Sequence, residues 1–288
     1  MPATENTLTV LRPRPAAPTR RTAPAGTARG RDRRRRTAAA AGPLSAAALV
    51  LCLWQLVCVL HLSATLPTPA AVGHDLAAAW SRGALAPALL GSLRRCLAGF
   101  LASMAIGVPL GLLLSAAPVL RTPIAPVLSA IQSLPAAALV PVAVVGLGNS
   151  ERAVYTVVLL GAVPAIAAGT LASLDQVPPL LRRAGRSMGA AGPAYVRHIL
   201  LPAALPGLLS ALEQGWTFGW RALMTAELIT ATPLPGIGRL LDEGRKGGHL
   251  SQVLAATAVI LAVGVLVESA VFAPLRRRAL RQRGLTAP

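Results

Sequence analysis

Charged residues are scarce in this chain of 288 residues, because Asp, Glu, Lys and Arg together make up only 13%. This is about half the share found in a typical soluble domain, so a soluble fold of this length would lack the charge to cover its surface. Aromatic residues are also rare, at 3%, and the 54% hydrophobic content is therefore mostly Ala, Leu and Val. Small side chains of this kind suit closely packed membrane helices. The composition, with a mean hydropathy of +0.59, predicts an integral membrane protein.

Cysteine, lysine and histidine are nearly absent. Cys52, Cys58 and Cys96 lie in or beside apolar runs without paired spacing, which indicates small hydrophobic residues rather than a redox or metal site. The only lysine is Lys246, and no G-x-x-x-x-G-K-S/T phosphate loop occurs. The four histidines show no metal-ligand spacing. We therefore expect the chain to bind no metal and no cofactor of its own, and not to be an ATPase.

The net charge of +18 raises the alternative of a nucleic-acid-binding protein. The distribution of the charge argues against it, since ten arginines lie within residues 12–36 and five within residues 276–283. Basic segments that flank apolar spans orient membrane proteins. We interpret these segments as basic tails, residues 1–42 and 276–288, and expect anionic lipid rather than nucleic acid near them. Residues 1–42 contain few large apolar side chains and are expected to be disordered.

Six apolar runs are long enough to cross a hydrocarbon core of roughly 30 Å. The first follows a basic region and so resembles a signal peptide, but its length favours an uncleaved span. An amphipathic stretch, residues 76–93, is too polar to span and is expected to lie at the membrane interface; it belongs with the first span in a segment 43–92. The six predicted spans cover about 44–66, 96–116, 124–145, 154–174, 205–229 and 253–272.

The distribution of basic residues also predicts the orientation. If the N-terminus is cytoplasmic, 20 of the 28 basic residues fall in segments 1–42, 117–123, 175–203 and 274–288, all on the cytoplasmic side. The positive-inside rule favours this arrangement. We expect a multi-pass protein of a bacterial cell membrane with both termini in the cytoplasm.

The loop between the fourth and fifth spans is the most informative segment. Residues 180–188 have helical spacing, and Gly189 is suited to end that helix in a left-handed conformation. Pro193 is suited to the first turn of a second short helix, and Pro202 is expected to break the chain before span five. The pattern predicts two short helices joined by a glycine bend.

This loop resembles the EAA loop of ABC-importer permeases, whose pattern is E-A-A, three residues, G, nine residues and I-x-L-P. Nine residues separate Gly189 from the I-L-L-P sequence at residues 199–202, whereas R-A-G replaces E-A-A at residues 183–185. The resemblance implies that this loop, residues 180–202, docks a separate ATPase. The docking residues that it implies are Arg183, Ala184, Gly185, Gly189, Pro193, Ile199, Leu201 and Pro202.

The resemblance extends over about residues 90–275. G-V-P-L-G at 107–111, the proline-rich run from Leu134 to Gly148, Trp220 with Ala226 and Glu227, and L-P-G-I-G at 234–238 follow in the family's order. The series resembles the branch that imports nitrate, aliphatic sulfonates or taurine. It implies an all-α, type I importer permease fold of about six spans, with its core at residues 93–275.

The family resemblance also implies the partners. Two permease subunits, here most simply a homodimer, would form a central path, two ATPase subunits would bind ATP and Mg, and an extracytoplasmic solute-binding protein would deliver the solute. A secondary transporter or channel is the main alternative, but neither inverted repeats nor dense intramembrane charge is visible. An intramembrane enzyme is a third possibility, with no Gly-x-Ser-x-Gly motif to support it.

Ionisable residues within spans are functional candidates by default. Five residues of span five fall at helical offsets and are predicted to share one face: Glu213, Thr217, Trp220, Met224 and Glu227. Either this face lines the translocation path, with Arg221 at its edge offering charge to an anionic solute, or it packs against other helices, with Glu227 in a structural hydrogen bond.

Overall fold

The computed structural model describes residues 45–62, 65–230 and 234–281. The expected disordered tail, residues 1–42, and the end of the basic C-terminal tail lie outside these ranges. Every regular element within them is helical. By its internal contacts the chain divides after Leu56 into two units. Of the first unit, the structure describes only the beginning of an apolar helix, Ser45–Val59.

The second unit is a succession of helices, most of them longer than two turns. Two short π-helical segments, η1 and η2, are continuous with the α-helices that follow them, since helices run unbroken over Gly192–Ile229 and Leu250–Arg281. The elements are α2 (Pro69–Ser81), α3 (Leu85–Ala116), α4 (Pro118–Ser133), α5 (Ala136–Leu147), α6 (Glu151–Asp175), α7 (Pro179–Ser187), α8 (Gly192–Tyr195), η1 (Val196–Leu200), α9 (Leu201–Ile229), α10 (Ile237–Lys246), α11 (Leu250–Val267), η2 (Glu268–Phe272) and α12 (Ala273–Arg281).

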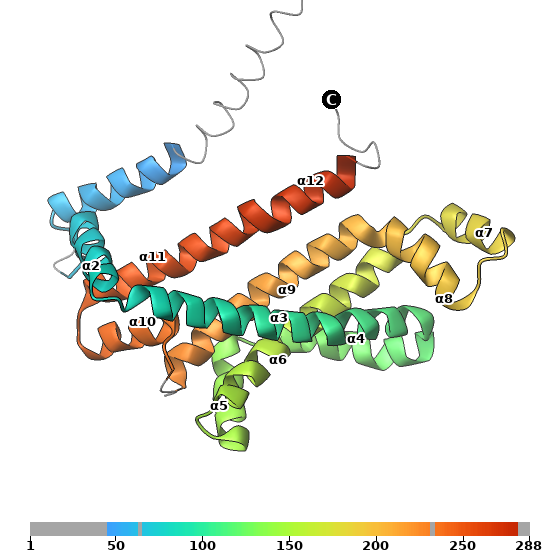
Figure 1. Ribbon diagram of the computed structural model, residues 1–288, viewed down its shortest axis with the longest axis horizontal. Helices are drawn as coiled ribbons and strands as arrows, with labels where there is room; N and C mark the ends of the chain where they lie inside the picture. The colour runs from blue at the N-terminus through green and yellow to red at the C-terminus, as the bar shows by residue number, and fades with distance from the viewer. Residues whose placement is uncertain (1–44, 63–64, 231–233, 282–288) are drawn as a thin grey trace, which may run out of the picture. The chain divides into compact units, whose positions relative to one another are not determined.

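Helix α6 is the centre of this unit, because it packs along both α3 and α9 (Figure 1). Small residues allow the close approach. A Cβ atom added to Gly111 of α3 would lie 2.6 Å from the carbonyl oxygen of Ala167 and from Cβ of Thr170, both on α6. Half of the largest fully buried side chains in the described part of the chain come from α6 itself. The core is therefore a three-helix contact with glycine and alanine at its closest points.

Among the described residues, four helices are long and apolar enough to cross a membrane, and the α4–α5 pair makes a fifth if it counts as one span. The shorter helix Ser45–Val59 lies where the first span was predicted. The third predicted span, residues 124–145, is not straight, because α4 and α5 meet at an angle of 101°. Leu134 has an extended backbone, with ψ of 133°, as expected for a residue that precedes proline. Pro135 therefore breaks this span.

The predicted interfacial segment, residues 76–93, is not one element. Helix α2 ends at Ser81, the chain turns at Gly83 with φ of +69°, and α3 begins at Leu85. The last part of the segment is therefore the beginning of the second span, which starts 11 residues before the predicted Cys96. The prediction was wrong here because Arg94 and Arg95 interrupt the apolar run without interrupting the helix.

Pro202 does not break the chain before span five, contrary to prediction. The helix runs without interruption over Gly192–Ile229, with Pro202 in the first turn of α9. The five preceding residues form the π-helical segment η1, and the amide of Leu201 donates to the carbonyl of Val196, five residues earlier. A π turn is wide enough to accommodate a proline ring, and the ring has no amide hydrogen to leave unpaired.

Candidate functional site

The loop between α6 and α9 forms a compact knob, residues 176–200, built from the short helix α7, the predicted glycine bend and the first turns of the helix that continues into α9. The second short helix of the prediction is therefore not a separate element. Helix α7 ends at Ser187, and Gly189 follows with φ of +79°. The amide of Ala190 then donates to the carbonyl of Gly185 at 3.1 Å, which closes the helix end. Pro193 lies in the first turn of α8. A backbone hydrogen bond and a left-handed glycine therefore define the end of α7.

Side chains pack the two halves of the knob against each other. Gly185 is buried, and a Cβ atom there would collide with Ile199 and lie 3.3 Å from the ring of Tyr195. The guanidinium of Arg186 lies 5.8 Å from the centre of the same ring, within cation–π range. Arg182 donates a hydrogen bond to the carbonyl oxygen of Leu174 at the end of α6. The knob is therefore a rigid unit attached to the core.

The other predicted docking residues divide between the surface and this packing. Arg183, Ala184 and Pro193 are exposed. Leu201 is half-buried and packs with Leu200 against the cluster where α6 meets α9, whereas Pro202 is exposed.

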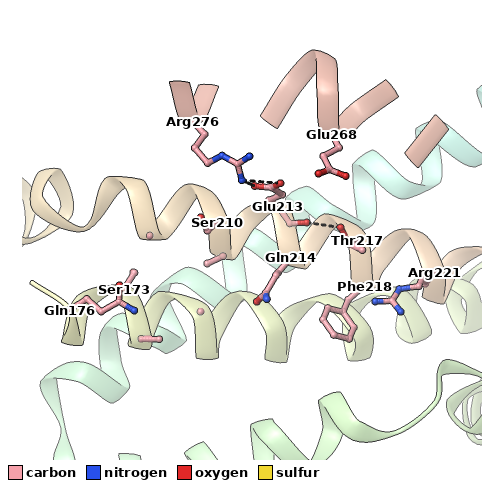
Figure 2. A pocket seen from close by; sticks show the side chains of 14 residues that line it. Ser173, Gln176, Ser210, Glu213, Gln214, Thr217, Phe218, Arg221, Glu268 and Arg276 are labelled. Carbon is pink, nitrogen blue, oxygen red and sulfur yellow. Dashed lines mark hydrogen bonds and ion pairs between the residues drawn. The ribbon is translucent and has the colours of Figure 1, made fainter. Parts of the chain in front are cut away.

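A cavity of about 660 Å³ lies beside the knob, between the end of α6, the first half of α9 and the helix that includes η2 and α12. Figure 2 shows Arg276 and Glu268 projecting from that helix toward α9, while Gln214 and Phe218 of α9 point toward α6. Most of the polar lining is uncharged and able to form hydrogen bonds: Ser173, Gln176, Ser210, Gln214 and Thr217.

One pair of opposite charges lines this cavity. Arg276 donates to Glu213 at 3.1 Å, and the hydroxyl of Thr217 donates to the backbone carbonyl of Glu213 at 3.0 Å (Figure 2). Glu268 and Arg221 also line the cavity. Among the residues that the structure describes, neither takes part in an ion pair.

A second cavity, of about 350 Å³, lies at the bend between α4 and α5. Phe218 and Arg221 line both cavities, and the Arg221 guanidinium carbon lies 5.1 Å from the centre of the Phe218 ring. The two hollows therefore adjoin along one side of α9, with a guanidinium at their junction.

Glu227 lies away from both cavities, in a buried polar network near the end of α9. Its carboxylate accepts hydrogen bonds from Arg95 Nη1 at 2.5 Å, from the Ser92 hydroxyl and from the Gly238 amide at 3.1 Å. Arg95 also donates through Nε to Glu151 at 3.2 Å and through Nη2 to the carbonyl of Pro235 at 2.9 Å. The network joins α3, α6 and α9 to the segment that leads into α10.

Sequence reasoning placed Arg95 outside the second span and so missed its role in this network. The available signal was a helical pattern that continues through Arg94 and Arg95 without a capping residue between them and the apolar run. Glu227, the partner of Arg95, is 132 residues away in the chain. No local sequence pattern reveals a contact over such a separation.

Trp220 and Met224 are also buried. The indole of Trp220 donates to the carbonyl of Ile260 on α11 at 3.3 Å and stacks on Trp216. The predicted face of span five is thus divided: Glu213 and Thr217 line the cavity with Arg221, whereas Trp220, Met224 and Glu227 pack within the protein.

Comparison with known proteins now identifies the family. Residues 105–279, more than half of the chain, match the model of the binding-protein-dependent transport system inner membrane component. The chain belongs to this permease family. The taurine transport system permease of Escherichia coli K12 is 30% identical over 68% of this chain and 68% of its own length. The nitrate import permease of a Synechocystis strain is 26% identical over 78% of this chain and 84% of its own.

A solved structure gives the same fold. The MetNI methionine ABC transporter, in an inward-facing conformation, contains a chain of which 97% superposes on 69% of this permease, with a TM-score of 0.59 and 22% identity. The predicted all-α, type I importer permease fold and the predicted kinship with nitrate-, sulfonate- and taurine-type permeases are therefore confirmed. The permease is a multi-pass membrane protein of a transport system.

Proposed function

We propose that this permease is the membrane subunit of an ATP-driven importer for a small solute such as nitrate, a sulfonate or taurine, and that the knob couples it to a separate ATPase. The observation that carries the proposal is the knob itself. It is packed around Gly185, tied to α6 through Arg182 and continuous with α9. A force applied to such a unit is transmitted to the helices that line the cavity.

The complete transporter would contain two copies of this permease, two ATPase subunits that bind ATP and Mg, and an extracytoplasmic solute-binding protein. Both termini and the knob would lie in the cytoplasm of a bacterium, in agreement with the arginine distribution. This chain would carry out no hydrolysis itself.

The translocation path would follow the side of α9 on which the two cavities adjoin. Arg221 would attract the anionic group of the solute, since it lines both hollows and takes part in no ion pair within the described part of the chain. Glu213 and Thr217 would line the path nearer the knob. Trp220, Met224 and Glu227, whose spacing also suggested a place in the path, would instead pack α9 against other helices.

Uptake into proteoliposomes tests the proposal. The permease would be reconstituted with the ATPase and binding protein encoded by neighbouring genes, and ATP-dependent uptake of labelled taurine, an alkane sulfonate and nitrate measured. We expect Arg221→Gln to reduce uptake about tenfold or more, as expected for loss of a charge-assisted contact, and Arg94→Gln, an exposed arginine of α3, to have no effect. Uptake driven by an ion gradient without ATPase would instead indicate a secondary transporter.

A further inference from the structure

The charge on the knob has only one sign. Between residues 176 and 204 the sequence contains four arginines and one histidine but no aspartate or glutamate. The acidic residue next to it, Asp175, is bound by two nitrogens of Arg121 at 2.7 and 3.1 Å. The acidic residue that adjoins the knob in the sequence is therefore already paired with an arginine outside the knob, and no carboxylate within the knob balances its positive charge.

Three of the four arginines are directed toward the outside of the knob. Arg183 and Arg186 on α7 and Arg197 on η1 are exposed, whereas Arg182 is half-buried and hydrogen-bonded to the carbonyl of Leu174. The cations therefore come from both halves of the knob. Two apolar side chains of the same helix region are also largely uncovered: Leu180 in the first turn of α7 and Met188 just after its last residue are each 77% exposed.

Arg183 is the informative member, because it occupies the position where the loop pattern of the family has glutamate. A charge of opposite sign at a docking position requires an opposite charge on the partner, since like charges brought together at an interface cost several kcal/mol. The exposed Leu180 and Met188 provide apolar surface for a docking contact, and the arginines provide charged groups for it.

We propose that the ATPase partner presents an acidic cleft to this knob, with carboxylates placed to meet Arg183, Arg186 and Arg197 and with apolar surface to receive Leu180 and Met188. The inference rests on the proposed function and specifies the chemistry of the docking partner. A permease with glutamate at this position would need an ATPase with a basic cleft. The inference implies that an ATPase of that kind does not assemble with this permease.

The structure of the knob favours a protein partner over lipid headgroups. An interfacial helix binds a membrane with a continuous apolar face along its length, whereas α7 has only nine residues and its buried face is occupied by Ile199 and Tyr195. The positive-φ bend at Gly189 and the packing at Gly185 fix the arginines of the two helices relative to each other. A fixed constellation of charges favours a partner that is itself structured.

Binding of the purified ATPase to the full-length permease tests the inference. The permease would be held in nanodiscs of phosphatidylcholine, which has no net charge, and the Kd measured at increasing NaCl concentration. We expect the Kd of the wild-type permease to rise with salt concentration. Arg183→Glu should raise the Kd about tenfold at low salt, and Arg183→Lys should raise it less. The control is Arg152→Glu, an exposed arginine at the opposite end of α6. Replacement of a cleft carboxylate of the ATPase by lysine should restore binding to Arg183→Glu.

Several results would overturn the inference. Binding that is insensitive to salt, or equal or tighter binding by Arg183→Glu, would show that the cleft is not acidic while leaving the proposed function intact. If Arg183→Glu leaves ATPase binding unchanged but weakens attachment of the knob to phosphatidylglycerol vesicles, the arginines bind lipid and not the ATPase. Failure of the wild-type permease to bind the ATPase at any salt concentration would overturn both this inference and the proposed function. Because the substituted arginines are exposed, the melting temperature should be the same in all variants.

Discussion

A buried ion pair is the residue-level feature that most sharply distinguishes this permease from a simple bundle of apolar helices. The side chains of Arg95 and Glu227 are only 7% and 3% exposed. Buried charges are tolerated when their hydrogen-bonding groups are satisfied. Here Ser92 bridges the two segments, since its hydroxyl donates to Glu227 and accepts from the amide of Ile237 at 2.9 Å. The pair therefore fixes the segment before α10 against α3 and α9.

Removal of one member of this pair should destabilise the protein strongly. Arg95→Leu leaves Glu227 buried without its cation, a change that costs about 3–5 kcal/mol. We expect a large drop in the melting temperature of the protein purified in detergent, measured by intrinsic tryptophan fluorescence. The matched control is Arg94→Leu, which alters the neighbouring exposed arginine and should change the melting temperature little.

The double variant Arg95→Leu/Glu227→Leu separates charge burial from packing. Because it leaves no unpaired buried charge, it should recover most of the stability that Arg95→Leu loses. If the double variant is as unstable as the single one, the contribution of the pair comes from its shape and its contacts with Pro235 and Glu151 rather than from charge compensation.

The sequence was sufficient to pick out candidate residues of the site, but it did not predict which residues surround them in the fold. Glu227 was singled out as an ionisable residue within a span, and a structural hydrogen bond was one of its two interpretations. The division of span five into a cavity side and a packed side could not be foreseen, because a helical offset places residues on one face but does not tell which helices cover it. Trp220 and Thr217 are three positions apart, yet one is buried and the other exposed.

At the scale of single elements, α10 carries its own charge network. Asp242 accepts from Lys246 at 2.6 Å and from Arg245 at 2.7 Å. These hydrogen bonds, first that of Lys246 and then that of Arg245, lower the pKa of the Asp242 carboxyl. The stabilisation is therefore fully present above the ordinary aspartate pKa of about 3.9 and is lost as the pH falls through the lower value in the folded protein.

This network predicts how substitutions in α10 change the pKa of Asp242. Lys246→Gln should raise the pKa of Asp242 toward about 3.9, and by more than Arg245→Gln does, because the Lys246 hydrogen bond is the larger cause. The measurement is a pH titration by NMR of carboxyl-labelled aspartate, with the resonance assigned through Asp242→Asn. Equal effects of the two substitutions would contradict the assigned order of causes.

The packing of α7 on η1 gives a second element-scale prediction. Gly185→Val would push a side chain into Ile199 and Tyr195, and overpacking of this kind costs about 1–3 kcal/mol. We expect the knob to lose protection against hydrogen exchange and ATP-driven uptake to fall, while spans away from the knob stay protected.

Ile199→Ala added to Gly185→Val should restore both protection and uptake, because it removes the methyl groups that the valine meets. Ile199→Ala alone serves as the matched control for the loss of those methyl groups. Continued loss of uptake in the double variant, despite restored protection, would mean that Ile199 itself contacts the partner.

Element types and order followed from the sequence, whereas the effect of each proline did not. Pro135 breaks a span with a 101° bend, but Pro109 and Pro164 lie inside long continuous helices. The residue before a proline is biased toward extended structure in every case. Tertiary packing decides whether that bias interrupts a helix. At Pro135 it does, and the segments on either side, α4 and α5, each pack against α6.

At the scale of the whole molecule, the knob and α10 must lie on opposite sides of the membrane if α9 crosses it once. The knob immediately precedes α9, and α10 follows it after residues 230–236. This relation holds for either orientation of the chain. The arginine distribution favours one of the two orientations and predicts that the knob lies in the cytoplasm, the side where ATP is available.

Thiol labelling tests this choice. In a variant with Cys52, Cys58 and Cys96 replaced by serine or alanine, we would introduce Met188→Cys in the knob or Lys246→Cys at the end of α10, both at exposed positions. A membrane-impermeant maleimide added to intact spheroplasts should label only Lys246→Cys, and the same reagent added to inside-out vesicles should label only Met188→Cys. The reverse pattern would place the knob outside the cell, where no ATPase could reach it, and the proposed coupling would have to be abandoned. Labelling of both sites from one side would mean that α9 does not cross the membrane. The translocation path proposed along α9 would then be wrong.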